Sequence, residues 1–572
     1  MEELNSRYWT SALRRPVSRR TVLRGAGMTG AGLAAAALIG CGSDEDEPTA
    51  TASATGDGGT ATGTGTEAVS AGKPGGRLQL TQAGDPPSFD LHRESTTYTA
   101  YSTSMGYNQL IRMDPAVGEE TPESVIGDLA TEWEISPDGL TYTFNLVQNA
   151  KYHDGTPFTA ADVKASYERQ INPPEALGKP PRGGQLKVIE SIDTPDDYTL
   201  VLNLARPASS LSLLPILAQG WMAIYSQKDV EGGFDFRQNV NGTGAYKLNS
   251  YEQGSKVVWD KNPDYHVAER PYLDGVDLYI IPDTSTALAN FQGGQLNVYS
   301  PTKKDLESLT ASLGDKIVTQ PTKGYGFNTI NFGGRDPWTD VRVREAVAMA
   351  MNKQSAIDVL AFGDGRLGGY LSGEGYWSLS AEEMTAIPGY AAWDESLITE
   401  ARKMLDAAGV PATMDSTILT RQGSSFEAFS LYVQDQLAKL GINAALDIQE
   451  TASAYEIMSK LDFDLAPWNH AYAVDDPDAV FAEFYITGAP RNYSQVSSPE
   501  VDDMYLAQSQ EQDPETRRQM VKDLQLTAMP LYGKILTNWT NARESHWATV
   551  KNYTSHTSIY NNRRWQDVWL DA

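Results

Sequence analysis

The chain has 572 residues, too many for a single hydrophobic core, which predicts two or three domains. Its 46 basic and 74 acidic residues give a net charge of −28, and so negative a surface argues against nucleic acid or anionic lipid heads as partners held by bulk charge. The only cysteine, Cys41, excludes an intramolecular disulfide and any zinc or iron–sulfur site built from several cysteines.

The N-terminal residues are typical of a bacterial export signal. Arg19 and Arg20 lie in a segment that resembles a twin-arginine signal, with general secretion as the alternative route. The apolar run over 26–40 is too short to span a membrane. It ends in Leu-Ile-Gly-Cys, which resembles a lipobox, so we predict that 1–41 is a signal peptide and that Cys41 becomes the lipid-anchored first residue of the mature protein.

Residues 42–73 predict a disordered tether. An acidic run at 44–47 is followed almost entirely by Thr, Ala, Gly and Ser. Such a segment cannot bury enough apolar surface to offset the entropy lost on ordering. As a flexible coil of about 30 residues, it would span roughly 30 Å between the membrane and a folded body.

The first part of the folded body is predicted to be rich in strands. A short strand at 78–80 is broken at 85–87, and apolar and polar residues alternate over 140–146. A capping box at 159–162 opens a helix that runs to Tyr167. Further strands are expected at the following ranges: 199–204, 256–259 and 276–281.

The second half is predicted to contain more helices. Asp340 can cap a helix that runs through Met351. Two more helices, 396–408 and 426–440, each end before a glycine, and a strand follows at 444–448. Helices and strands alternate throughout, which predicts an α/β fold with mixed sheets.

Several segments resemble motifs of the solute-binding proteins of ABC transporters, family 5, the peptide/nickel type. The strongest are DLATEWEISPDGLTYTF at 128–144 and KYHDGTPFTAADV at 151–163, which stand in one register. Shorter matches keep the same order along the chain: 76–90, 241–248, 327–346 and 476–481. The resemblance therefore covers roughly residues 75–570.

This resemblance implies a two-lobed periplasmic-binding-protein-like fold of type II, the large peptide-binding type, with mixed sheets, a hinge and an extra inserted domain. Domain I would be assembled from three stretches: 74–115, 236–320 and 536–572. Domain II would be an insertion at 116–235, and domain III, the second lobe, would span 321–535. The ligand would be enclosed between the lobes, because ligand contacts to both favour the closed state.

The resemblance places the first candidate ligand site in the strand and loop at 465–478. Its candidate residues are Trp468, Asn469, His470, Tyr472, Asp475 and Asp476. In peptide binders of this family, an acidic residue that captures the free α-ammonium lies three positions before the Asp-Pro pair, where this chain has Ala473. A free-amine peptide is therefore disfavoured relative to a blocked peptide, an oligosaccharide or another polar solute, unless Asp475 or Asp476 substitutes.

Alternation along the strand predicts that Trp468, His470 and Tyr472 point to one side. Rings and hydrogen-bond donors suit a cleft that holds a polar ligand, although an aromatic core face would show the same pattern. Further candidates lie on the strand that leads out of the crossover into domain III, for which core packing is again the alternative, and in a Gly-rich loop: Tyr325, Phe327, Asn328, Arg366 and Trp377.

Signals of catalysis and of metal binding are weak. The G-x-G-x-x-G at 363–368 follows a helical segment instead of a strand, which argues against a dinucleotide site. The sequence has no P-loop, G-x-S-x-G or H-E-x-x-H motif, and its six histidines are scattered. We therefore expect no enzyme activity, no cofactor and no metal.

The predicted function is that of the substrate-binding receptor of an ABC importer. It would act as a monomer and deliver a peptide or other medium-sized polar solute to a permease and ATPase complex. It would be extracytoplasmic, lipid-anchored to the outer face of the cell membrane or periplasmic. The alternatives are a sensory receptor on the same fold, a binder of oligosaccharide and an exported hydrolase.

Overall fold

The computed structural model describes residues 72–571 apart from 119–123, 209, 323, 325 and 559–562. The predicted signal peptide, Cys41 and nearly all of the predicted tether lie outside the described residues. Within the described ranges, no helix combines the length and the apolar character needed to cross a membrane.

A four-stranded mixed sheet contains the first predicted strand. Its order is β1 (Arg77–Gln82), β10 (Gly275–Ile280), β9 (Lys256–Lys261) and β8 (Tyr246–Glu252). β1 pairs in parallel with β10 although nearly two hundred residues separate them, and the other pairs are antiparallel. Leu78 and Leu80 point into a core with Trp259, which confirms the strands expected at 78–80, 256–259 and 276–281.

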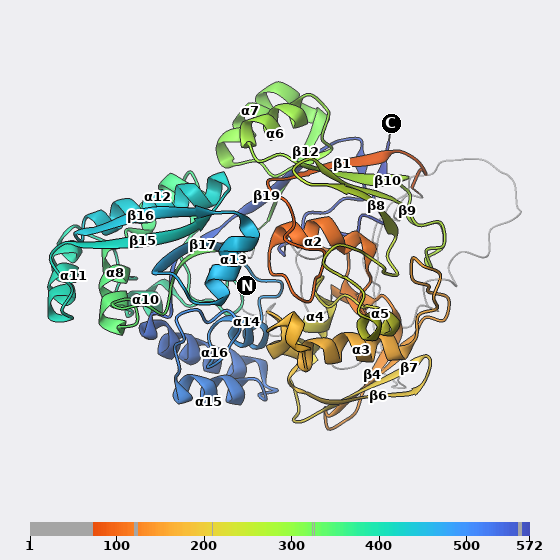
Figure 1. Ribbon diagram of the computed structural model, residues 1–572, viewed down its shortest axis with the longest axis horizontal. Coiled ribbons are helices and arrows are strands. Elements are labelled where there is room, and N and C mark those ends of the chain that lie inside the picture. The colour runs from red at the N-terminus through yellow and green to blue at the C-terminus, as the bar shows by residue number, and fades with distance from the viewer. Residues whose placement is uncertain are drawn as a thin grey trace, which may run out of the picture. The chain divides into compact units, whose positions relative to one another are not determined.

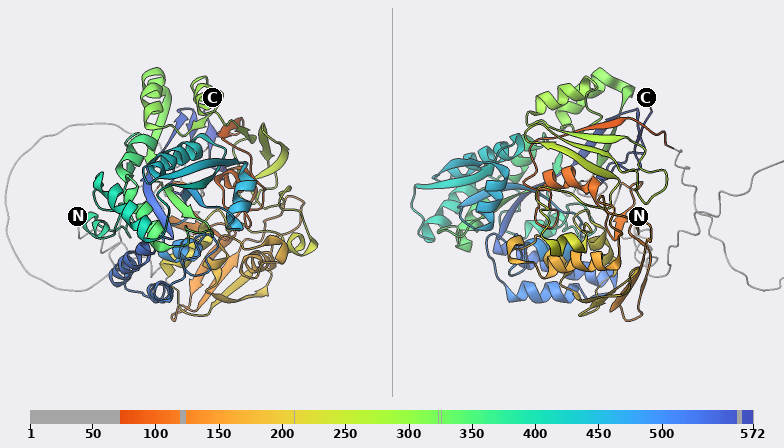
Figure 2. Two further views of the ribbon diagram at one scale, coloured as in Figure 1. Left: turned by 60° about the vertical axis from the view of Figure 1, so that its left-hand side comes forward. Right: turned by 45° about the vertical axis from the view of Figure 1, so that its right-hand side comes forward.

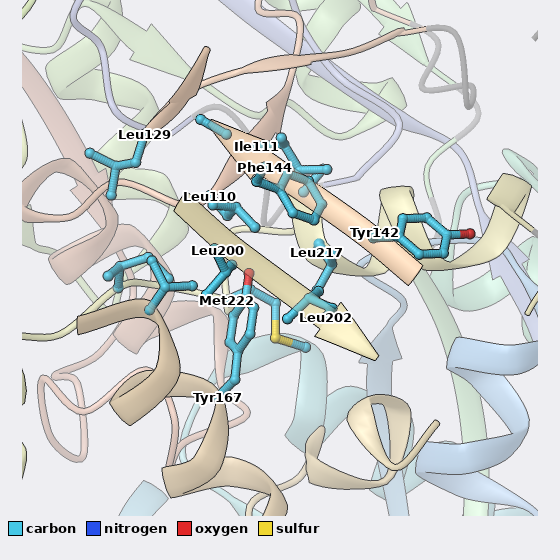
Figure 3. Packing of buried hydrophobic residues seen from close by; sticks show 14 of the residues in the cluster. Leu110, Ile111, Leu129, Tyr142, Phe144, Tyr167, Leu200, Leu202, Leu217 and Met222 are labelled. Carbon is cyan, nitrogen blue, oxygen red and sulfur yellow. The ribbon is translucent and has the colours of Figure 1, made fainter. Parts of the chain in front are cut away.

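An antiparallel sheet is inserted between β1 and β8. Its order is β4 (Ala130–Ile135), β5 (Thr141–Leu146), β7 (Thr199–Leu204) and β6 (Ile189–Asp196). Buried and more exposed residues alternate along β5 and β7, as the sequence predicts for half-buried strands. Figure 3 shows the side chains of these strands packed with Tyr167 of α3 and Leu217 of α4. α3 (Ala160–Ile171) begins at the predicted capping box, and α4 spans Ser210–Ala218.

A small sheet leads from the first two sheets to the rest of the chain. Its order is β11 (Val298–Tyr299), β19 (Ala542–Trp547) and β12 (Ile317–Thr322). Figure 1 shows β19, from the C-terminal part of the chain, beside β12. The helices before β12 are α6 (Thr284–Gln292) and α7 (Lys303–Leu313).

The largest sheet is mixed and has six strands. Its order is β14 (Gly365–Arg366), β18 (Lys534–Thr540), β13 (Gly326–Phe332), β17 (Leu465–Ala471), β15 (Met414–Arg421) and β16 (Ile442–Gln449). The predicted helices at 340–351, 396–408 and 426–440 are confirmed as α8 (Val341–Ala350), α11 (Ser396–Ala407) and α12 (Ser424–Ala438). α12 packs against β15, β16 and β17 (Figures 1 and 2).

The remaining elements are short strands and connecting helices. They are β2 (Ile111–Met113), β3 (Val125–Gly127), β20 (Val550–Lys551), β21 (Trp569–Leu570), α2 (Thr97–Thr103), α5 (Gln227–Gly232), α9 (Lys353–Leu360), α10 (Ala381–Thr385), α13 (Thr451–Ser459), α14 (Pro477–Phe484), α15 (Pro499–Gln508) and α16 (Pro514–Ala528). A 3-10 turn, η5 (Gly183–Leu186), precedes β6.

The folded body is a two-lobed α/β structure with mixed sheets. We name residues 77–322 with 542–571 the first lobe, and residues 326–540, which carry the six-stranded sheet, the second lobe. The chain crosses between the lobes twice, from β12 to β13 and from β18 to β19. The finer limits of domains I, II and III stay predictions.

Candidate functional site between the lobes

The end of β15 places a buried arginine, Arg421, among aromatic rings from both lobes. Its guanidinium carbon lies 3.9 Å from the ring centre of Phe426 and 4.7 Å from that of Tyr98. The rings of Trp468 and Tyr455 follow at 5.9 and 6.0 Å. Tyr98 belongs to α2 of the first lobe and the other three to the second lobe, and we name this arrangement the Arg421 cage. Such distances are those of cation–π contacts.

The hydrogen bonds to Arg421 do not use all of its N–H donors. One Nη donates to Thr451 Oγ1 at 3.3 Å, and the buried Nε has no hydrogen-bond partner among the described residues. Over those same residues, no carboxylate forms an ion pair with Arg421. A guanidinium offers five N–H donors in a fork that fits a carboxylate, and a buried cation without an anion costs several kcal/mol. The cage therefore has the chemistry to bind an anionic group of a ligand.

A cavity of about 1050 Å³ lies between the lobes next to the cage. Ala83 of the first lobe and Ser424 of the second line it. A side-chain carbon added at Gly84 would meet the Tyr98 ring at 2.7 Å, and one at Gly423 would lie 3.9 Å from its hydroxyl. Gly84 follows Ala83 and Gly423 precedes Ser424, so Tyr98 lies beside both lining segments. The cage and the cavity are therefore side by side. The volume is at the upper end of the range for ligand pockets.

An ion pair near the crossing from β18 to β19 forms part of the cavity wall. Arg563 donates to Glu544 Oε1 at 2.8 Å and to the hydroxyl of Tyr101 at 3.0 Å, and Tyr553 donates to the other Glu544 oxygen. Burial by itself would raise the pKa of Glu544, but the charge of Arg563 and these hydrogen bonds bring it below its usual value. The pair stays charged and mutually satisfied at neutral pH.

Trp468 is the sequence-predicted site residue that the structure brings to the Arg421 cage. Its indole packs edge-on against Phe426 at 5.2 Å and Tyr455 at 5.3 Å between ring centres, and its Nε1 donates to the Tyr455 hydroxyl at 3.4 Å. Because the side chain is fully buried, it shapes the cage as well as packing the core.

The predicted ring pair of His470 and Tyr472 lies in an aromatic core beneath α14. Both rings pack against Phe484 and Phe327, and Tyr472 donates to the carbonyl of Tyr370 at 2.8 Å. Burial, with the nearby Arg491 and Lys534 charges, lowers the pKa of His470 well below its usual value. Their surroundings are those of an aromatic core, the alternative that the sequence left open. Contact of either ring with a ligand stays a prediction.

Asn469 and Asn328 face each other across β17 and β13, on the opposite side of the sheet from His470. Asn328 donates to Asn538 Oδ1 at 3.2 Å. The Oδ1 atoms of Asn469 and Asn328 are buried without a partner among the described residues. Both amides thus keep an acceptor for a ligand or water. Tyr325, which the sequence predicts together with Phe327 and Asn328, lies outside the described residues.

Both predicted acids of the loop after β17 have partners within the second lobe. Asp476 caps α14 and forms a two-pronged ion pair with Arg517, each oxygen at 3.1 Å. Asp475 accepts from the backbone N–H of Ser372 at 3.0 Å. Burial, and then repulsion from Asp476, raise the pKa of Asp475 to about 7. These bonds leave little carboxylate surface for a ligand ammonium, and the predicted ligand role of both acids stays untested.

Arg366 and Trp377 also take part in packing within the second lobe. Arg366 donates to the carbonyls of Gly373 at 2.6 Å and Gly324 at 2.9 Å. The ring of Trp377 lies 4.8 Å below the Arg517 guanidinium. Their predicted ligand contacts remain predictions.

Ala473, where peptide binders of the resembled family carry an acid, lies in an apolar contact between the lobes. It packs in one cluster with Tyr107, Trp221 and Leu91 of the first lobe. A free ammonium there would be buried without a counter-charge, which costs several kcal/mol.

Sequence reasoning missed Arg421 and three of its four rings. Arg421 is the last residue of a strand, shortly before a glycine and a helix. Arginines on the protein surface also occupy such positions, so the local sequence does not mark Arg421 as a site residue. The rings come from α2, α12 and α13, which no local pattern connects.

Comparison with known proteins identifies the family. The sequence model of the family described as "Bacterial extracellular solute-binding proteins, family 5 Middle" matches residues 124–492. The chain belongs to this family. The resemblance noted in the sequence is thereby confirmed.

Curated relatives are named for peptide binding. A Brucella ovis protein named as an ABC transporter peptide-binding protein is 29% identical over 351 residues, which cover 59% of this chain. The chain spans 63% of the length of that relative. The oligopeptide-binding protein AppA of Bacillus subtilis is 26% identical over 421 residues, 69% of this chain and 73% of AppA.

Solved structures share the fold. The periplasmic binding protein DppA from Helicobacter pylori, in complex with the peptide STSA, gives a TM-score of 0.76 at 22% identity over 87% of this chain and 99% of that one. The binding protein AgaA from A. tumefacien R10, in complex with agropinic acid, gives 0.75 at 23% identity over 87% and 99%. At these identities the likeness establishes the two-lobed fold alone.

Proposed function

We propose that the protein is the substrate-binding receptor of an ABC importer. It captures a solute between its two lobes and delivers it to a membrane permease and ATPase. Family membership supports this role, as do two chain crossings about which the lobes can hinge and a large cavity between them. It acts without catalysis, so a captured solute is released unchanged.

The solute class follows from the Arg421 cage. The observation that carries the proposal is a buried guanidinium between the lobes that has spare donors and no carboxylate partner in the described part of the chain. A carboxylate on the solute supplies the missing anion. Ala473 provides no anion for an ammonium. We therefore propose a peptide-like solute that has a free carboxylate and a blocked amine.

A thermal-shift screen of the purified protein tests this proposal. The panels are N-acetylated peptide acids, the same peptides amidated at the C-terminus, free-amine peptides and oligosaccharides, each near 1 mM. A micromolar ligand at that concentration stabilises by roughly 4 kcal/mol. We expect the melting temperature to rise with the N-acetylated acids alone. An equal rise with the amidated peptides would contradict the role of Arg421, and a rise only with free-amine peptides would contradict that of Ala473.

We further propose that the mature protein is held at the outer face of the cell membrane by a lipid on Cys41. The support is the twin-arginine-like segment, the apolar run and the lipobox-like end of that run. Two acyl signals give stable anchoring, whereas a single chain binds reversibly. The predicted tether after Cys41 then lets the folded body turn freely.

A further inference from the structure

The cavity beside the Arg421 cage has an apolar wall on the second lobe. Val359, Phe362 and Leu431 line it, from α9, the residues after α9, and α12. Their exposed fractions are 59%, 47% and 53%, among the largest of the big apolar side chains in the described chain. Gathering exposed apolar side chains in one hollow is typical of a binding site.

Two side-chain amides in the same cavity each have a buried, unpaired oxygen. Gln82, at the end of β1 in the first lobe, is 6% exposed, and its Nε2 donates to Gly84 O at 2.8 Å and Ser102 Oγ at 2.9 Å. Gln436, on α12 in the second lobe, is 3% exposed, and its Nε2 donates to Asp435 at 3.1 Å. Neither Oε1 has a partner among the described residues. A buried acceptor left unpaired costs about 1–3 kcal/mol, so each needs a donor.

The charges of the cavity lining cancel. Among the described residues that line it, the three cations and three anions are Lys304, Lys439, Arg563, Asp305, Asp435 and Glu544. Lys439 pairs with Asp435 at 3.0 Å and Arg563 with Glu544 at 2.8 Å. The carboxylate of Asp305 accepts a hydrogen bond from the backbone N–H of Thr302, the N-cap of α7. The cavity thus favours an uncharged group, in contrast to the cage.

We infer that this cavity binds the uncharged, apolar body of the solute whose carboxylate is held by Arg421. Donors of that body, amide N–H groups, bond to Gln82 on one lobe and Gln436 on the other, and its apolar side chains cover Val359, Phe362 and Leu431. The inference rests on the proposed function and narrows it to N-acylated peptides with apolar side chains. Because the two amide oxygens belong to different lobes, such a solute links the lobes as it binds.

Calorimetric titration of the whole protein with two probes tests the inference. N-acetylglycine offers a carboxylate and almost no body, and N-acetyl-Leu-Val-Phe-Ala offers both. The variants are Leu431→Ser and Gln436→Leu in the cavity, with Leu506→Ser as the matched control. Leu506 lies on α15, is 44% exposed and does not line the cavity. Leu431 is already half exposed, so its replacement does not endanger the fold.

We expect Leu431→Ser and Gln436→Leu each to weaken the tetrapeptide about tenfold and to leave N-acetylglycine within about twofold. Leu506→Ser should change neither probe. If both probes bind the wild type and the two cavity variants bind the tetrapeptide as the wild type does, the cavity inference is wrong while the proposed function stands. If neither probe binds the wild type, the proposed function fails and the inference fails with it.

Discussion

At the scale of single residues, the Arg421 cage shows how a buried cation is retained when no described carboxylate pairs with it. The faces of Tyr98 and Phe426 offer π-electron density at 4.7 and 3.9 Å, which offsets part of the cost of taking the guanidinium out of water. The buried Nε has no hydrogen-bond partner in the part of the chain that the structure describes. Such a site can stay folded without a ligand. Binding of an anion adds charge-assisted hydrogen bonds and therefore stabilises it further.

Replacement of Arg421 by Gln should therefore abolish carboxylate recognition. We expect affinity for N-acetylated peptide acids to fall at least about 100-fold, because a charge-assisted hydrogen bond pair in a buried site is lost. Titration calorimetry measures the change. The control is Arg342→Gln, an exposed arginine on α8, which should bind as the wild type does. Retained affinity in Arg421→Gln would exclude the cage as the carboxylate site.

Asp475 predicts a pH dependence of stability. Its pKa is raised to about 7 in the folded state from 3.8, so the folded protein binds more protons than the unfolded chain between these values. Stability is therefore lost as pH rises from about 4 to about 7, by on the order of 4 kcal/mol from this group alone. Urea unfolding at pH 4.5, 6 and 8 should show a flatter profile for Asp475→Asn than for the wild type. Parallel profiles would refute the assignment.

At the scale of elements, α14 joins the lobes through polar contacts with Arg182, the residue before η5, and with α4. Glu483 of α14 lies 3.5 Å from Arg182 of the first lobe and 2.9 Å from Arg491 of its own lobe. Ser212 of α4 donates to Asp478 Oδ2 at 2.9 Å. These contacts form only when the lobes are together, so they add to the stability of the closed state whatever the solute.

Ser212→Ala removes one of these bonds with little change in shape. We expect solute affinity to fall by roughly 3- to 10-fold, the value of one hydrogen bond, because the closed state becomes less populated. The melting temperature of the solute-free protein should change little. The comparison variant is Thr527→Ala, an exposed hydroxyl on α16 that bonds within its own helix. Equal affinities for the two variants would show that the contact does not favour closure.

At the scale of the whole molecule, the folded body is predicted to bind its solute independently of the lipid anchor. Cys41→Ala should release the protein from the membrane fraction while its solute affinity stays unchanged, because no described residue of the site lies near the anchor in the sequence. Metabolic labelling with palmitate, followed by fractionation and titration, measures both properties. Full retention of the label in Cys41→Ala would contradict the predicted lipid site.

The sequence by itself determined the family, the fold class and most elements of the body. Alternation along β5 and β7, the capping box of α3 and the glycines that end α11 and α12 are local signals, because each depends on residues a few positions apart. It also drew attention to Ala473 and to Trp468, whose ring lies in the Arg421 cage, while the ligand role of both positions stays a prediction. The export signal and Cys41 stay predictions of the sequence.

Only the tertiary structure decided which residues form the proposed binding site. Arg421 and Tyr98 are separated by more than three hundred residues, and Gln82 and Gln436 line one cavity from different lobes. The same fold placed His470 and Tyr472 in a core under α14, although their alternation fits a cleft equally well. Periodicity along a strand tells which side chains share a face, but what covers that face is set by elements distant in the chain.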